Sequence, residues 1–145
     1  MKTKWAVFFL LALCGFLLIL FFGIPEPNAI NRTYTGVAAN IRENDGSLSV
    51  NNLELSPEAA QEVLTAVQSH SYAALFPNGT VVASAPTQAI ILFLIYQTDG
   101  RDAYTMFTIS SAGVITIEEK TYVLFPKNDR EQKQLFQTIY DIIPK

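Results

Sequence analysis

The chain begins with a long, uninterrupted run of apolar side chains. Residues 5–24 contain no charged side chain, and Lys2 and Lys4 lie immediately before them. Twenty helical residues are about 30 Å long, which matches the hydrocarbon thickness of a bilayer. The pattern therefore predicts an N-terminal transmembrane helix.

Two other interpretations of this run compete with an uncleaved anchor. A cleaved secretory signal has a shorter apolar core, of about 7–15 residues, followed by small residues at the cleavage site. Here the candidate pairs of cleavage positions are Phe21 with Gly23 and Pro27 with Ala29, and neither pair fits well. A lipoprotein signal would use Cys14, but Leu13 precedes it where a small residue is needed. We expect an anchor, and cleavage and lipidation of Cys14 remain open.

The flanking charges predict the orientation of the anchor. Lys2 and Lys4 precede the run, and residues 25–31 contain no Lys or Arg. The positive-inside rule then places the N-terminus in the cytoplasm and the long C-terminal part outside. We expect a single-pass protein of the cell membrane with three parts: a cytoplasmic stub and anchor (1–24), a linker (25–32) and an extracytoplasmic domain (33–145).

The first part of the outer domain shows strand signals followed by a helix. Residues 33–41 and 47–53 are predicted strands on either side of an Asp45-Gly46 turn, because these residues tolerate positive φ. Ser56 can cap a helix that has Pro57 at its first position. Apolar residues recur after it at helical spacing until about residue 69.

Short strands then alternate with turns until a final helix. Strands are predicted at 72–76, 80–83, 89–96, 103–109, 114–117 and 121–125, with turns at 77–79, 99–100 and 111–113. Residues 89–96 are the most apolar of these and are predicted to be buried on both faces of the sheet. Asp129 is the predicted cap of the last helix, and Gln132 would complete a capping box.

This order of elements favours an α+β fold. We expect an antiparallel sheet with two helices packed on one face, in the order β-α-β4-α of the TATA-binding-protein-like topology. The analogy concerns topology alone and implies no DNA binding.

Four segments of the outer domain also resemble small uncharacterised domains that Gram-positive-type bacteria carry outside the membrane. The matching segments are SPEAAQEVLTAVQSH, AIILFLIYQTDG, DAYTMFTIS and QLFQTIYDII. Such domains are often lipoproteins or single-pass proteins, so the resemblance implies an extracytoplasmic location. It implies no catalytic residues, because that group has none established.

Charge and cysteine content narrow the partners of the outer domain. Without Lys2 and Lys4 the chain has 8 basic and 13 acidic side chains, a formal charge of −5. This balance argues against nucleic acid and anionic lipid as partners. The sole cysteine is Cys14, so the outer domain has no disulfide and its core must stabilise it.

The sequence offers few candidates for chemistry, and each has a structural explanation. His70 stands at a helix end, where histidine commonly interacts with terminal carbonyls or solvent. Asp99 and Asp102 flank a turn without the ligand spacing of a calcium loop. Glu118 and Glu119 are adjacent, so on a strand they would face opposite ways. Ser84, Ser110 and Ser111 lack a nucleophile-elbow motif, and the triplets at 31–33 and 78–80 match glycosylation sequons.

We therefore predict no catalytic residue, no cofactor and no metal site. The favoured function is a membrane-tethered, non-enzymatic domain that binds another envelope or membrane protein through a sheet face or edge. An aromatic patch among the six tyrosines could contribute to such a contact. The alternatives are a small-ligand sensor with a pocket between sheet and helices and, with less support, a hydrolase.

Overall fold

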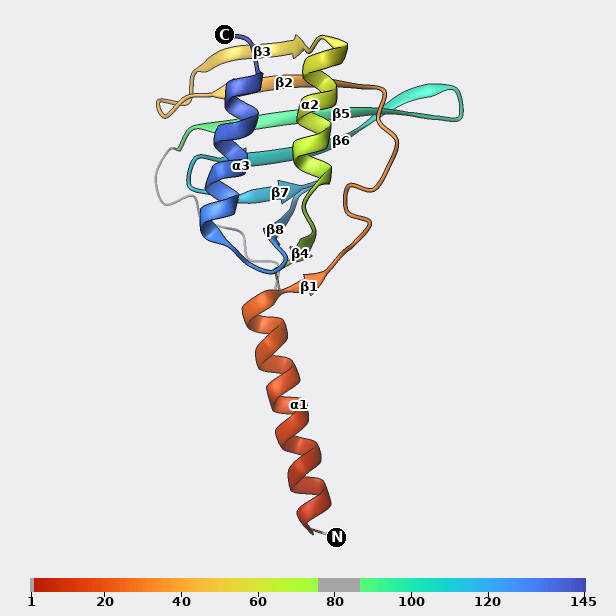
Figure 1. Cartoon of the computed structure of the whole chain (residues 1–145), viewed down its shortest axis with the longest axis vertical. Helices are drawn as coiled ribbons and strands as arrows, with labels where there is room; N and C mark the ends of the chain where they lie inside the picture. The colour runs from red at the N-terminus through yellow and green to blue at the C-terminus, as the bar shows by residue number, and fades with distance from the viewer. Residues whose placement is uncertain (1, 76–86) are drawn as a thin grey trace.

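The computed structural model describes residues 2–75 and 87–145 and consists of a sheet, two helices packed on it and a projecting N-terminal helix (Figure 1). The strand predicted at 80–83, the turn predicted at 77–79 and the sequon at 78–80 lie outside the described residues. In chain order the elements are α1 (Lys2–Phe22), β1 (Ile24–Pro25), β2 (Gly36–Arg42), β3 (Leu48–Glu54), α2 (Pro57–Gln68), β4 (Tyr72–Ala74), β5 (Ala89–Thr98), β6 (Arg101–Ser110), β7 (Ile115–Ile117), β8 (Lys120–Leu124) and α3 (Asp129–Ile142).

The strands form one antiparallel sheet in the order β1-β4-β8-β7-β6-β5-β2-β3. Helices α2 and α3 lie on the same face of this sheet and cross its strands (Figure 1). The predicted α+β class is therefore confirmed. The predicted order β-α-β4-α is not what the structure contains, because three strands precede α2 and five described strands separate it from α3.

The core lies between the two helices and the covered face of the sheet. Both helices present an apolar stripe at helical spacing, as the sequence predicts, and the Ser56 side chain accepts a hydrogen bond from Ala59 N at the start of α2. Alternate residues of the central strands meet these stripes. The buried residues include Val63, Leu64 and Val67 of α2, Leu135, Phe136 and Ile139 of α3, and Ile90, Leu92, Leu94, Phe107 and Ile109 of β5 and β6.

Strand β5 is buried on one face, and the prediction that residues 89–96 are buried on both faces is wrong. Ile90, Leu92 and Leu94 are fully buried under the helices. Ile91 and Phe93 point to the other face and are only half-buried. Every described strand-to-strand pairing is antiparallel, and no described helix covers that second face. An apolar strand therefore leaves half of its side chains accessible.

The start of α3 differs from the predicted capping box. Asn128 is the cap, and its side chain accepts a hydrogen bond from Glu131 N. Gln132 is instead buried, and its side chain joins α3 to two distant segments. Its Oε1 accepts from Leu124 N at 3.1 Å, and its Nε2 donates to the Gly113 carbonyl at 2.7 Å.

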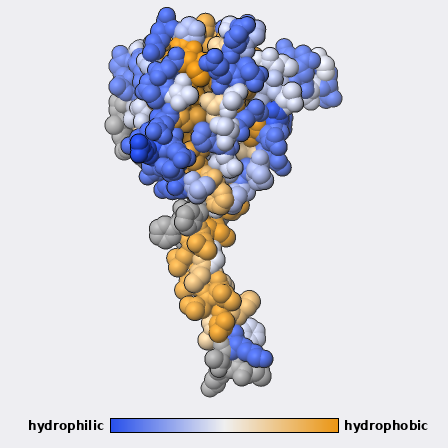
Figure 2. All heavy atoms as spheres, in the orientation of Figure 1, coloured by the Kyte–Doolittle hydropathy of each residue, from blue (hydrophilic) through white to orange (hydrophobic). Residues whose placement is uncertain are grey.

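Helix α1 extends away from the sheet, beyond β1 (Figure 1). Its described side chains are largely apolar and exposed, as the mostly orange surface of the projecting helix shows (Figure 2). Within residues 2–75 and 87–145, no helix combines the length and the hydropathy of a membrane span.

The chain enters the sheet directly after α1. Ile24 pairs with Ala74 and Pro25 with Ala73, and Glu26 N donates to the Tyr72 carbonyl. The boundaries at residues 24 and 32 stay a prediction, but residues 24–26 are paired chain rather than a free tether.

Gly23 makes this close approach possible. Its φ of +75° is a left-handed conformation, and a Cβ on it would lie 2.6 Å from the Ala74 carbonyl oxygen. A side chain at this position would therefore displace the end of α1 from the sheet.

Replacing Gln132 with alanine should destabilise the domain. The change leaves the Leu124 N–H and the Gly113 carbonyl without partners in a buried place, which costs about 2–4 kcal/mol in total. Chemical unfolding of the full chain in detergent micelles measures the free energy. Gln134→Ala is the control because that side chain is exposed on the same helix. Equal stability of the two variants would contradict the role of Gln132.

Gly23→Ala should weaken the junction between α1 and the sheet more than Gly46→Ala weakens its turn. Both glycines have positive φ, but a Cβ at Gly46 meets nothing within 4 Å. The left-handed backbone costs each variant about 1–2 kcal/mol, and the clash with Ala74 adds to this cost at Gly23 alone. Hydrogen exchange at the Glu26 amide reports the junction locally. Unchanged protection of that amide in Gly23→Ala would contradict the prediction.

Candidate functional site

The acidic residues that the sequence offers for chemistry occupy turns at two places. Asp99 has φ of +50° in the β5–β6 turn, and Asp102 accepts a hydrogen bond from Gln97 at 3.2 Å across the hairpin. Glu118 and Glu119 form the β7–β8 turn, both with positive φ. Each group has a structural partner or a turn conformation, as the sequence indicates.

The candidate serines within the described residues also have structural roles. The Ser110 hydroxyl accepts a hydrogen bond from Val114 N at 3.2 Å, and Ser111 N donates to the Gln88 carbonyl. Ser84 lies outside the described residues. Cys14 is exposed on α1. Among the residues that the structure describes, no three His, Cys, Asp or Glu side chains gather as a metal-ion site.

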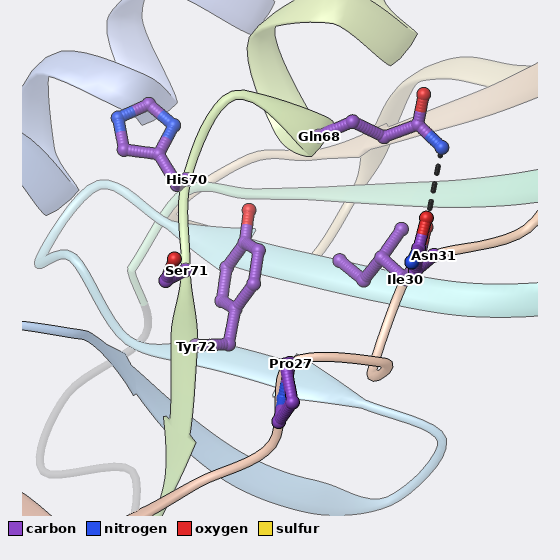
Figure 3. Close-up of a pocket in the computed structure, with 7 residues that line it drawn as sticks. All are labelled: Pro27, Ile30, Asn31, Gln68, His70, Ser71 and Tyr72. Carbon is purple, nitrogen blue, oxygen red and sulfur yellow. Dashed lines mark hydrogen bonds between the residues drawn. The ribbon is translucent and has the colours of Figure 1, made fainter.

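His70 lies at the edge of a pocket of about 260 Å³ near the end of α2. Pro27 and Asn31 of the β1–β2 connection line the pocket together with Gln68, Ser71 and Tyr72 (Figure 3). The Gln68 side chain donates to the Ile30 carbonyl at 3.2 Å and to the Arg32 carbonyl at 3.0 Å. These bonds hold the connection against the helix and form one wall of the pocket.

The His70 ring is engaged with the end of α2. Its Nδ1 lies 2.9 Å from the Ala66 carbonyl oxygen and 3.1 Å from Ser69 Oγ. Because a carbonyl can only accept, we assign a proton to Nδ1 in this contact. The prediction that this histidine interacts with helix-terminal carbonyls is confirmed.

Tyr72 and Tyr122 anchor the region where α1 meets the sheet. The buried Tyr72 hydroxyl donates to the Val67 carbonyl at 2.7 Å, and burial raises the pKa of this phenol. The Tyr122 hydroxyl donates to Glu26 Oε2 at 2.6 Å. Burial and the neighbouring Glu26 carboxylate raise the pKa of Tyr122. Glu26 Oε1 also lies 3.9 Å from Lys120 Nζ, so side chains tie the residue after β1 to β8, whereas the backbone of β1 pairs with β4.

The other candidate site is the uncovered face of the sheet. We name the side chains of Ile91, Phe93, Ile95, Tyr104 and Met106 the open face. Phe93 is opposite Met106, and Ile95 is opposite Tyr104, so these residues form adjacent rows on β5 and β6. The Phe93 and Tyr104 rings meet edge to face with centroids 5.3 Å apart. Tyr104 is 60 % exposed and lies three residues after the start of β6, near the β5–β6 turn.

Small residues on β2 create a hollow beside these rings. Gly36 is opposite Ile95, and Ala38 is opposite Phe93. The hollow has a volume of about 350 Å³. Glu54 and Asp102 line it at its two sides, on β3 and β6, together with Asn52. An apolar, partly aromatic surface thus has carboxylates at its rim.

Sequence reasoning expected a sheet face or edge as the contact but did not identify these residues, because it predicted residues 89–96 to be buried on both faces. The available signal was in the partner strand: Arg101–Ser110 places Asp102 and Tyr104 on the same face as Phe93. A strand buried on both faces would not pair with such side chains.

Comparisons of the chain with protein-family models, with curated proteins and with solved structures found no match. The functional argument therefore depends on the geometry of the molecule.

The free energy of unfolding should fall as the pH rises above about 10, the ordinary pKa of tyrosine. Tyr72 and Tyr122 hold their protons more tightly in the folded state, because their pKa values are raised there. Their contribution is complete below the unfolded-state pKa and is lost at higher pH, where the unfolded chain releases these protons.

Tyr72→Phe isolates one of these contributions. The variant should be less stable at pH 7 by about 1–2 kcal/mol, because the Val67 carbonyl loses its partner. It should also lose less stability than the natural chain between about pH 9 and pH 11. Urea unfolding at a series of pH values measures both effects. An unchanged pH dependence in Tyr72→Phe would contradict the assignment.

Proposed function

We propose that this chain is a single-pass membrane protein whose outer domain binds another membrane or envelope protein through the open face. The observation that carries the proposal is the contiguous apolar surface of exposed Tyr104 and half-buried Phe93 and Ile95, on a sheet whose other face is a closed core. Apolar surface of this kind on a soluble domain is characteristic of interaction sites.

The anchoring part of the proposal is supported by α1 and its sequence. Residues 5–24 carry no charged side chain, and the 21 residues of the helix are about 32 Å long. The statement that no helix has the length and hydropathy of a membrane span concerns residues 2–75 and 87–145. The apolar run of residues 5–24 is a feature of the full sequence. Exposed side chains such as Phe8, Phe9 and Leu10 need an apolar environment, which lipid supplies.

The N-terminus is proposed to be cytoplasmic, with the domain outside. Lys2 and Lys4 flank the run on one side, and Trp5 stands at the position of an interfacial aromatic residue. The outer domain, of formal charge −5, favours protein partners over nucleic acid and anionic lipid.

Membrane fractionation tests the anchor. The chain should remain in the membrane after an alkaline carbonate wash and keep the mass of the uncleaved sequence. A version with Leu10 and Leu17 replaced by arginine should be extracted, because each charge at mid-membrane opposes insertion by about 2.5–3.5 kcal/mol. Release of the natural chain, or a mass that lacks residues 1–24, would contradict an uncleaved anchor.

Site-specific photocrosslinking in the producing cells tests the binding surface. A photoreactive amino acid at position 104 should give a crosslinked partner of defined mass. The same group at position 134 serves as the control, because Gln134 is also exposed but lies on α3, on the other side of the sheet. Identical crosslinking from both positions, or none from position 104, would count against the open face as the binding site.

A small-ligand sensor is the second candidate, favoured by the pocket beside His70. Its lining of Asn31, Gln68 and Ser71 is polar, so the ligand would be a small polar molecule. Native mass spectrometry of the chain purified from its membrane would detect such a ligand, and Asn31→Leu should remove it.

A further inference from the structure

The open face and its rim identify the chemistry of the partner more closely than the proposed function does. Three observations contribute: the arrangement of charges around the hollow, the height of the hollow above the end of α1, and the charge of the domain as a whole. The inference rests on the proposed function, because it concerns the partner of the same surface.

The rim of the hollow carries negative charge that the described residues do not neutralise. Glu54 and Asp102 are both exposed and lie on opposite sides of Phe93 and Ile95. The described residues form an ion pair between Lys120 and Glu26, but this pair lies at the junction with α1 and not at the rim of the hollow. A third carboxylate, that of Glu118, accepts a hydrogen bond from Met106 N at 3.0 Å beside the same surface.

An apolar, partly aromatic surface with carboxylates at its rim suits a segment in which cationic and apolar side chains alternate. Lys and Arg have apolar stems that pack on exposed rings, and their charged ends bind carboxylates. A cation over Tyr104 or Phe93 would also be attracted by the ring face. Negative rims select against acidic partners, because like charges at an interface oppose association.

The position of the hollow in the sheet excludes the lipid surface as its occupant. Strand β1 continues directly from α1, and β5 lies five positions along the sheet from β1. Neighbouring strands are spaced by about 4.8 Å, so the open face is centred about 20–25 Å from the end of α1. The strands stack away from α1 (Figure 1), and the pairing of Ile24 and Pro25 with β4 maintains that height.

A second copy of this domain fits the surface less well than a cationic partner does. Two domains of formal charge −5 repel each other, and a twofold contact through the open face would place Glu54 and Asp102 of one copy near those of the other. We propose that the open face binds a positively charged, partly apolar segment of a different protein, which stands about 20 Å outside the bilayer.

Peptide binding by the full chain in lipid nanodiscs tests the partner class. The probe is a fluorescent ten-residue peptide in which Lys alternates with Phe and Tyr, and the comparison peptide has Glu in place of every Lys. The Lys peptide should bind and the Glu peptide should not. The affinity for the Lys peptide should fall with added salt, because exposed charges are screened.

Two double variants of equal net charge separate the rim from the overall charge. Glu54→Gln with Asp102→Asn should weaken binding of the Lys peptide about tenfold, because two charge pairs of modest strength are lost. Glu62→Gln with Asp141→Asn removes two exposed charges from α2 and α3 and should change the affinity less than about twofold. Equal losses in both double variants, or binding of the Glu peptide, would overturn the partner class.

The crosslinked partner from position 104 distinguishes failure of this inference from failure of the proposed function. A captured peptide rich in Lys or Arg supports both. A neutral or acidic captured segment, or a second copy of this chain, overturns the cationic partner while the open face remains a binding surface. Absence of capture from position 104 opposes the proposed function itself.

Discussion

Two helices of ordinary length cannot cover both faces of an antiparallel sheet with eight described strands, and the arrangement of the described residues follows from that limit. Helices α2 and α3, of 12 and 14 residues, are each about 20 Å long and lie on one face. On that face Ile90, Leu92 and Leu94 are fully buried. The opposite face of the same strands receives no described helix, so its apolar side chains stay accessible.

The attachment of helix α3 to the covered face of the sheet depends on polar as well as apolar contacts. Gln132 joins α3 to Leu124 of β8 and to Gly113 of the β6–β7 turn by two hydrogen bonds in a buried place. Gln88 similarly joins β5 to Glu43 at 2.7 Å and to the Tyr140 hydroxyl at 3.2 Å. These directional bonds fix the position of α3 on the sheet, which apolar packing alone defines less sharply.

The N-terminal helix α1 is connected to the sheet without a free linker, because the residues directly after it pair with β4. Ile24 and Pro25 pair with β4, and the Glu26 carboxylate receives the Tyr122 hydroxyl. If α1 is the anchor that we propose, the open face is presented at a defined height and direction rather than on a loose tether. Binding then loses less freedom, because the domain is already ordered relative to the membrane.

The sequence by itself determined the types of the elements and most of their limits. Helical spacing and a Ser-Pro start predicted α2, and Asp-Gly pairs at 45–46 and 99–100 predicted two turns that the structure contains. These features are local, because caps, turns and apolar stripes depend on residues within one or two helical turns of each other. The α+β class followed from their order.

The tertiary structure alone decided which surfaces are covered. Residues 89–96 are apolar at both odd and even positions, so their pattern cannot say which face of β5 the helices cover. Two-residue β1 has no periodicity to detect, and its pairing depends on Gly23 and on a strand about fifty residues away. The partners of Gln132 are also distant in sequence, because Gly113 and Leu124 meet it only after the sheet has formed. The open face, the junction and the attachment of α3 therefore arise from long-range contacts that no local pattern encodes.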